Sequence, residues 1–222
     1  GGLAIGAAVI AVASCDDPAP ATRAPTTSSF RFDLPDFYAS PFPFDGRTRA
    51  DGTVDLSNFP RPEVPNLVTS VVDLIDGHAR GFGTTSTIYF TFSAPLAEPA
   101  LTFEGSLAPG SPVALVGPDG PVPISVKVID DGGPYGDLNM LALLPLQGAP
   151  LRPNTLYVAY ATGDLRDKAG ERVEASAELA AYLAGGPITG GGEVWRTTSR
   201  GTAPETLCKV SEGGGAEVGV VP

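Results

Sequence analysis

Glycine and proline recur at short intervals along almost the whole chain, which has 28 glycines and 23 prolines in 222 residues. Glycine weakens the interior of helices and strands, and proline breaks a helix and cannot donate to a sheet ladder. Their combined share is almost twice that of an average protein. Long helices, coiled coils and helical bundles are therefore disfavoured, and short elements joined by tight turns are expected.

Between these turns lie short segments in which β-branched, aromatic and other apolar side chains alternate with polar ones. In the segment 87–93, Ile88, Phe90 and Phe92 fall on one face. The segments expected to form strands are 87–93, 100–103, 112–116, 122–129, 139–144, 155–161 and 193–198. Short strands at such intervals, separated by Gly and Pro turns, are typical of an antiparallel β-sandwich.

Two segments follow the period of a helix instead. Apolar residues recur at three- and four-residue spacing over 67–75, after Asn66 and before Gly77. The spacing predicts one amphipathic helix of about three turns, and a second short helix is expected over 176–184. The predicted fold class is mainly β, an antiparallel β-sandwich with one or two short helices.

Proline and aromatic residues crowd the segment 30–65. Because proline cannot sit inside a helix or a central strand, this segment is expected to be an extended N-terminal arm whose aromatic side chains pack on the domain. The domain itself is expected over 66–198. The Gly-rich, aperiodic segment 199–222 is expected to be a flexible tail or the start of a further region.

An uncharged apolar run opens the chain and ends in Val12-Ala13-Ser14-Cys15. It is far shorter than the ~20 residues that span a bilayer, but its length suits a secretory signal. The four residues resemble the lipobox of bacterial lipoproteins, whose cysteine receives the lipid. We expect a signal segment over 1–14 that lacks its basic n-region, lipidation at Cys15, and a flexible tether over 15–29. The alternative is a buried apolar helix or strand that ends in a cysteine.

The lipobox resemblance implies a protein of the bacterial cell envelope, held at the membrane by its N-terminal lipid. The outer membrane or the cell surface is preferred over the inner membrane, although Asp16 resembles an inner-membrane retention signal of some bacteria. If Cys15 carries the lipid, Cys208 has no partner within the chain, so a disulfide framework is excluded.

Other stretches resemble bacterial Ig-like domains of the Big type. Residues 141–160 and 163–170 match a strand, a corner of the form Leu-x-Pro-x-Thr-x-Tyr, and a return strand that ends in Leu-x-Asp-x-x-Gly. Residues 88–96 are similar to the first strand of such domains with its Phe-Ser-x-Pro-Leu turn. The resemblance extends over about half of the chain and implies an Ig-like β-sandwich.

The residues of this motif suit a corner and a tight loop. Pro153 and Asn154 preset a turn, and Tyr157 is expected to pack or to hydrogen-bond at the corner. Asp167 and Gly170 are expected to close a loop that requires a positive φ.

A weaker likeness involves the segments 41–47, 51–52 and 81–84. They are similar to the N-terminal domain of bacterial virulence-factor lipases and to myxobacterial-type surface lipoproteins. In those lipases an Ig-like module precedes an α/β-hydrolase. The likeness implies an accessory module rather than a catalytic domain.

The sequence contains no recognisable set of catalytic residues. It lacks Gly-x-Ser-x-Gly, and its only histidine, His78, lies upstream of where a catalytic partner is expected. His78 is expected to interact with the dipole or the last carbonyls of the preceding helix. The Gly-rich runs at 185–186 and 190–192 lack the Lys-Ser/Thr of a phosphate loop. We therefore expect no enzyme activity and no cofactor.

The net charge and the number of cysteine and histidine residues argue against nucleic-acid binding and against a zinc site. The chain has 25 acidic against 14 basic residues and a net charge of -11, which disfavours binding to nucleic acid. Two cysteines and one histidine are too few for a Cys/His zinc site. No metal site is expected.

Two acidic loops leave calcium open as a weak alternative, because loop oxygens suit that cation. Neither loop has the spacing of an EF-hand, so solvated turns are the preferred explanation. The weak calcium candidates are Asp45, Asp51 and Asp55 in one loop and Asp130, Asp131 and Asp137 in the other.

Taken together, these features predict a non-catalytic cell-envelope lipoprotein that displays an Ig-like domain for adhesion, scaffolding or binding of a protein or carbohydrate partner. Two alternatives stay open. One is the N-terminal accessory domain of a secreted esterase or lipase whose catalytic domain is absent from this chain. The other is a calcium-dependent binding module.

Overall fold

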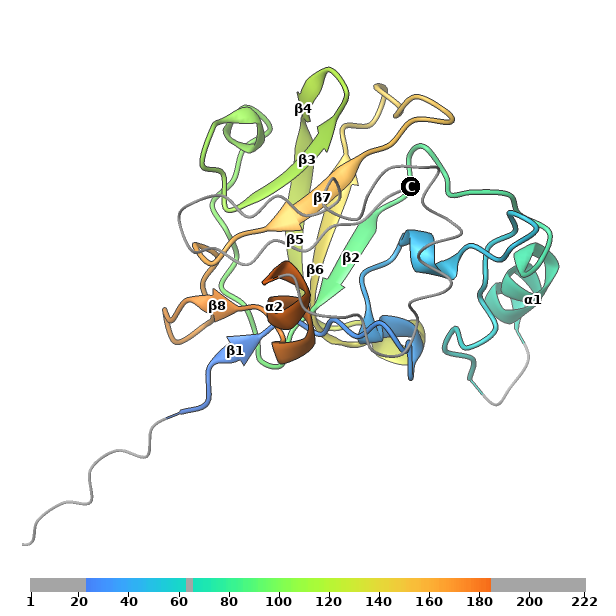
Figure 1. Ribbon diagram of the computed structural model, residues 1–222, viewed down its shortest axis with the longest axis horizontal. Helices are drawn as coiled ribbons and strands as arrows, with labels where there is room; N and C mark the ends of the chain where they lie inside the picture. Colours follow the sequence, from blue (N-terminus) through green and yellow to red (C-terminus); the bar gives the residue numbers. More distant parts are fainter. Residues whose placement is uncertain (1–22, 63–65, 185–222) are drawn as a thin grey trace, which may run out of the picture.

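The computed structural model describes residues 23–62 and 66–184 (Figure 1). Within these ranges the fold is mainly β, with short strands in three sheets and two α-helices. The expected signal segment 1–14, Cys15, the expected strand 193–198, the tail 199–222 and Cys208 lie outside the described residues.

Two three-stranded antiparallel sheets make up the body of the fold (Figure 1). One joins β2 (Ile88–Thr91), β6 (Leu138–Pro145) and β5 (Ile124–Asp131) in that order. The other joins β4 (Gly120–Val122), β3 (Val113–Gly117) and β7 (Val158–Ala161). A short parallel pair consists of β1 (Thr26–Thr27) and β8 (Val173–Glu174). The arrangement is consistent with a β-sandwich.

The two larger sheets share one apolar core. In the pairing of β2 with β6, Ile88 lies opposite Leu143 and Phe90 opposite Leu141, and all four side chains are buried. Leu115 of β3 joins the same cluster from the other sheet. The alternation of apolar and polar residues thus turns one face of each sheet toward a common interior.

The expected strands at 87–93, 112–116, 139–144 and 155–161 are present with somewhat different ends. The expected strand at 100–103 is wrong. There the Gly105 N–H donates to the Thr102 hydroxyl at 3.0 Å, and the chain turns into a 3₁₀ helix over Gly105–Leu107. A side-chain oxygen that binds the backbone locally competes with sheet pairing, and here it prevails.

The segment 122–129 forms two strands instead of one. β4 ends at Val122 in one sheet, and β5 begins at Ile124 in the other. Pro123, which stands between them, has no N–H to offer to a ladder. The proline therefore marks the point at which the chain passes from one sheet to the other.

Residues 26–29 differ from the expected tether. Thr26 is buried in β1, the Ser29 N–H donates to the Thr91 carbonyl at 2.7 Å, and the Ser93 N–H donates to the Thr27 carbonyl at 2.9 Å. This segment therefore borders β2 as well as β8. Its Thr/Ser composition permits either a linker or a strand, and pairing with two distant segments decides between them.

The Pro-rich segment is not extended throughout, because it contains 3₁₀ turns at Phe37–Ala39 and Asp45–Arg47. Its aromatic side chains enter two separate clusters. Phe30, Phe32 and Phe44 lie in the main core, whereas Phe37 and Tyr38 lie in a second cluster with Val54, Leu56, Val72 and Met140. Burial in two places bends the chain between them.

Both expected helices are present, as α1 (Leu67–Ile75) and α2 (Ala177–Leu183). The Ser176 hydroxyl accepts a hydrogen bond from the Leu179 N–H and caps α2, and Leu179 is fully buried in the main core. α1 packs elsewhere, against the second cluster.

Candidate interaction surface

Five large apolar side chains of α1 face solvent. Leu67 is 80% exposed, Leu74 70%, Val71 47%, Val68 42% and Ile75 38%. Leu67, Val71 and Leu74 are spaced as i, i+4 and i+7, so they form one stripe along the helix. We call these five residues the α1 ridge. In Figure 1, α1 lies at the edge of the molecule, away from the two larger sheets.

The contact of α1 with the rest of the protein is narrow. Only Thr69 and Val72 of the helix are buried, and Val72 belongs to the second cluster. Single exposed apolar residues are normal on a soluble protein, but a contiguous group of large ones marks an interaction site. The α1 ridge is therefore the candidate functional surface.

Polar contacts hold α1 where apolar burial does not. At its N-terminus the Asn66 side chain accepts a hydrogen bond from the Thr69 N–H at 3.1 Å, and the Thr69 hydroxyl accepts one from the Asn66 N–H at 3.3 Å. This reciprocal capping box starts the helix at the residue that the sequence indicated.

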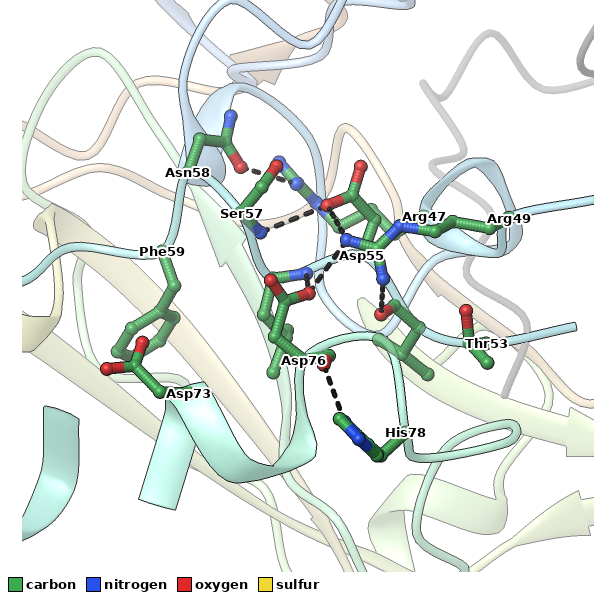
Figure 2. A network of polar contacts seen from close by, with 12 residues as sticks. Arg47, Arg49, Thr53, Asp55, Ser57, Asn58, Phe59, Asp73, Asp76 and His78 are labelled. Carbon is green, nitrogen blue, oxygen red and sulfur yellow. Dashed lines mark hydrogen bonds and ion pairs between the residues drawn. The ribbon is translucent and has the colours of Figure 1, made fainter. Parts of the chain in front are cut away.

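At the C-terminus of α1, Arg49 links the helix to the Pro-rich segment (Figure 2). Its Nη2 lies 2.8 Å from Oδ1 of Asp55 and 2.8 Å from Oδ1 of Asp76, and its Nη1 donates to the Val54 carbonyl at 2.6 Å. The same Asp76 oxygen accepts the Leu56 N–H at 2.8 Å. One guanidinium thus joins residues 54–56 to the end of the helix.

The groups in this cluster favour their charged forms. Burial raises the pKa of Asp76, but hydrogen bonds from the Leu56 N–H and Arg49 outweigh it and hold the pKa below its usual value. Asp55 behaves in the same way, with Ser57 and Arg49 as the groups that lower its pKa. The hydrogen bond to Asp76 raises the pKa of Arg49. Arg61 also acts on Asp76 and Arg47 on Asp55, so three arginines act on these two carboxylates.

A second arginine holds the middle of the helix. Nη2 of Arg61 lies 3.0 Å from Oδ1 of Asp73, and its Nη1 donates to the Ser57 carbonyl at 3.0 Å and the Phe59 carbonyl at 3.3 Å. α1 is thus fixed at its start, middle and end by polar groups, while the ridge points outward.

Arg47 stiffens the segment beneath these contacts. It is 2% exposed and donates to the Phe37 carbonyl at 2.6 Å and to Oδ1 of Asn58 at 2.8 Å, while its guanidinium lies 4.2 Å from the centre of the Phe37 ring. Among the described residues its Nε has no hydrogen-bond partner. Burial lowers the pKa of Arg47. Neither Arg47 nor Arg49 was predicted as a functional residue. The only feature of the sequence that marks them is their position between two Asp-Gly pairs.

The predicted corner precedes β7 and the predicted loop follows it. The Arg152 N–H donates to the Tyr157 hydroxyl at 2.9 Å, and Tyr157 is 5% exposed, so it both packs and hydrogen-bonds as expected. The Gly170 N–H donates to the Asp167 carbonyl at 2.9 Å, and Gly170 has a φ of +83°. The predicted positive φ at this loop is confirmed.

Asp167 also has a role that the motif did not reveal. Its buried carboxylate accepts hydrogen bonds from the Thr26 hydroxyl at 2.8 Å, the Ala169 N–H at 2.8 Å and the Glu171 N–H at 3.0 Å. Burial raises the pKa of Asp167, but these bonds outweigh it and hold the pKa below its usual value. The side chain therefore joins β1 to the loop before β8.

The weak calcium candidates do not converge. Oδ1 of Asp51 accepts from Thr53, Oδ1 of Asp131 from the Gly133 N–H, and Oδ1 of Asp137 from the Leu138 N–H. Asp55 binds Arg49, and Asp130 pairs with Lys168. Asp45 begins a 3₁₀ turn. In the described part of the chain no group of three or more His, Cys, Asp or Glu residues is placed to hold a metal ion.

His78 lies just beyond the C-terminus of α1, where it was expected to meet the last carbonyls. Its Nδ1 is 3.1 Å from the Asp76 carbonyl oxygen, and the ring is exposed (Figure 2).

Across the residues that the structure describes, no helix is both long and apolar enough to cross a membrane.

Compared with known proteins, the chain matches no family model, no curated protein and no solved structure. Its function must be argued from its own residues.

Proposed function

We propose that this chain is a non-catalytic lipoprotein of the bacterial cell envelope, anchored through Cys15, which displays an Ig-like β-sandwich and binds a partner. The sandwich is the scaffold and the α1 ridge is the binding surface. The lipobox at residues 12–15 supports the anchor. The support for the Ig-like fold and for binding comes from the described residues.

The order of the strands supports an Ig-like topology. In that fold, consecutive strands A to G divide into one sheet with the order A-B-E-D and another that contains C, F and G, with C′ beside C in some types. If β2 is strand B, then β2-β6-β5 corresponds to B-E-D, and β4-β3-β7 corresponds to C′-C-F. By chain order β1 and β8 then correspond to A and G, although they pair with each other. In this assignment β2 is the second strand, not the first strand that the resemblance of residues 88–96 implied.

Tyr157 supports the same assignment. Ig-like domains carry a tyrosine near the start of strand F whose hydroxyl bonds to the backbone a few residues upstream. Tyr157 immediately precedes β7, and its hydroxyl accepts the Arg152 N–H. The residue and its bond are those expected at this corner.

The observation that carries the binding role is the exposure of the α1 ridge. An element that serves only to complete a core turns its apolar side chains inward. α1 does the opposite: it is fixed by Asn66, Arg49 and Arg61 and presents its apolar side chains to solvent. The partner class is a protein or a carbohydrate surface, and the apolar character of the ridge favours a protein.

The anchor is tested with the protein expressed from its complete gene in a bacterium, beside Cys15→Ala and Cys208→Ala variants. We expect wild type and Cys208→Ala to carry more than one acyl chain by intact mass and to partition into detergent, because a single chain anchors only marginally. Cys15→Ala should stay in the aqueous phase. If Cys15→Ala still partitions like wild type, the proposed anchor and envelope location are wrong.

A further inference from the structure

We infer that the outer edge of β7, the side that faces away from β3, is a docking site for an extended strand, and that residues 193–198 of the same chain occupy this edge. Those residues lie outside the part of the chain that the structure describes. The inference goes beyond the proposed function, because it depends neither on the lipid anchor nor on the α1 ridge.

The backbone of β7 offers hydrogen-bonding groups on this edge. The Thr162 N–H, next to the end of β7, donates to the Pro112 carbonyl at 2.8 Å on the side of β3. In an antiparallel pair, residues that bond across the pair alternate with residues that do not. The N–H and C=O groups of Ala159 and Ala161 therefore point away from β3. In residues 23–62 and 66–184 these groups have no hydrogen-bond partner, and no strand borders β7 on this side.

The outer edge of β5 is closed by side chains instead. The Val128 N–H donates to Oε2 of Glu98 at 3.1 Å, and the Ile124 N–H donates to the Ser106 hydroxyl at 3.1 Å. Natural proteins protect exposed sheet edges in such ways, because an open edge pairs readily with another strand. β5 is therefore a poor site for a further strand.

The outer edges of β4 and β2 are closed as well. β4 contains Pro121, which has no N–H to offer to a further strand. Beside β2, Tyr89 and Phe42 exchange two backbone hydrogen bonds, of 2.7 and 3.0 Å. Among the outer strand edges of the two larger sheets, only that of β7 has neither a partner nor a protecting group within the described residues.

The size of the side chains along β7 also fits an added strand. Ala159 and Ala161 are buried in the main core, although alanine is depleted in strands. Small side chains leave room for large ones on a neighbouring strand, since directly opposite Cβ atoms lie only about 4.5–5.5 Å apart. Residues 193–198 supply large side chains that favour strands, namely those of Val194, Trp195, Thr197 and Thr198.

The position of this segment in the chain suits the same edge. α2 packs on the main core through Leu179 and ends at Leu183. Nine residue steps lead from 184 to 193, and an extended chain of that length reaches about 30 Å. The core of a sandwich is only about 10 Å thick. The chain after α2 is therefore long enough to return to β7.

β8 leaves this place open. By chain order it corresponds to strand G, which in Ig-like domains belongs to the sheet of strands C and F. β8 pairs with β1 and not with β7. Residues 193–198, which the sequence predicts to form a strand, complete the sheet β4-β3-β7 in its place.

The experiment uses the whole 222-residue chain, whose only tryptophan is Trp195. NMR records NOEs between residues 193–198 and β7, together with the amide exchange of Ala159 and Ala161. Acrylamide quenching measures the exposure of Trp195, and light scattering measures the molar mass.

Two double variants are compared with wild type. Val194→Pro/Thr197→Pro removes one N–H from each side of the expected strand, so it weakens pairing whichever side faces β7. The matched control, Thr202→Pro/Val218→Pro, makes the same two exchanges outside residues 193–198.

We expect wild type to be a monomer with NOEs from residues 193–198 to Ala159 and Ala161. In Val194→Pro/Thr197→Pro these two amides should exchange at least about 10-fold faster and Trp195 should be quenched at least about twofold more strongly, because the pairing is lost. The control should match wild type in both measurements. Leu141 in β6 should stay protected in all three proteins, which shows that the fold persists.

Wild-type protein without NOEs to β7, or exchange and quenching that Val194→Pro/Thr197→Pro leaves unchanged, would overturn the inference. A molar mass of two copies would overturn it as well, because the edge would then be filled by a second copy of this chain. If Val194→Pro/Thr197→Pro loses the protection of Leu141, that variant has unfolded, and the NOEs of wild type alone decide the outcome.

Discussion

Asp167 is a buried carboxylate in a loop. It accepts a hydrogen bond from Thr26, which lies 141 residues earlier in the chain. An unpaired buried charge is costly, but this one has three hydrogen bonds and an ion pair with Arg23 at 3.2 Å. The Leu-x-Asp-x-x-Gly motif indicated the turn. It did not indicate the bond to Thr26, because a contact this distant leaves no mark on local spacing.

We predict that Asp167→Ala lowers the free energy of unfolding by roughly 2–4 kcal/mol, since it removes several hydrogen bonds to a charged group. Asp164→Ala, which removes an exposed ion pair with Arg172, should cost about 0–1 kcal/mol. Urea unfolding at pH 7 compares the two. Equal losses would show that the buried carboxylate has no special role.

The lowered pKa of Asp167 also sets a pH dependence. A carboxyl whose pKa is lower in the folded protein stabilises it above the unfolded pKa of about 4, and this stabilisation is lost as pH falls through the folded pKa. We predict that, as pH falls from about 5 into the acid range, wild type loses more stability than Asp167→Asn. Urea midpoints measured across this pH range compare the two proteins. Equal losses would contradict the prediction.

Tyr38 should titrate unusually late. Burial raises its pKa to about 12, with further upward contributions from nearby Tyr89 and Asp137. Its hydroxyl donates to the Tyr135 carbonyl at 2.6 Å. Because the folded pKa lies above the unfolded value of about 10, Tyr38 stabilises the fold below pH 10, and this contribution disappears as pH rises toward 12. Phenolate absorbance should show a late step that Tyr38→Phe removes; a Tyr38→Phe curve with the same late step would contradict the assignment.

At the scale of elements, local patterns located much of the secondary structure. The alternation of apolar and polar residues located β2, and Gly and Pro turn residues bounded β3, β6 and β7. The helical period of the apolar residues located α1, and Ser176 marked the start of α2. The errors arose where one residue outweighed the pattern: Thr102 turned a predicted strand into a 3₁₀ turn, and Pro123 divided another. Periodicity also predicted the apolar stripe of α1 but could not say whether protein or solvent faces it.

Because α1 has little apolar contact, we predict that its attachment depends on Arg49. Arg49→Ala should cost about 1–2 kcal/mol, a value reduced for partial exposure, and should speed amide exchange in α1 while β6 stays protected. Arg31→Ala, which removes an exposed pair with nearby Asp33, is the matched control. Unchanged exchange in α1 would show that Val72 and the Asn66 cap suffice to hold the helix.

At the scale of the whole molecule, the two larger sheets and the 30–62 segment contribute mainly to different apolar clusters. The sheets and α2 enclose the main core, and the 30–62 segment builds a second cluster on which α1 rests. The sequence predicted a mainly β fold with short helices from turn spacing and alternation. It could not predict the second cluster, because Phe37, Val72 and Met140 come from three distant parts of the chain.

The central claim is that the α1 ridge is free to bind and is not needed for folding. Urea unfolding of Leu67→Ser/Leu74→Ser tests it directly, with Val72→Ala as the buried control on the same helix. We predict that the double variant stays within about 0.5 kcal/mol of wild type, while Val72→Ala loses about 1.5 kcal/mol for the two methyl groups that leave the core. A loss of more than about 2 kcal/mol in the double variant would contradict the claim, because that is the cost of uncovering buried leucines.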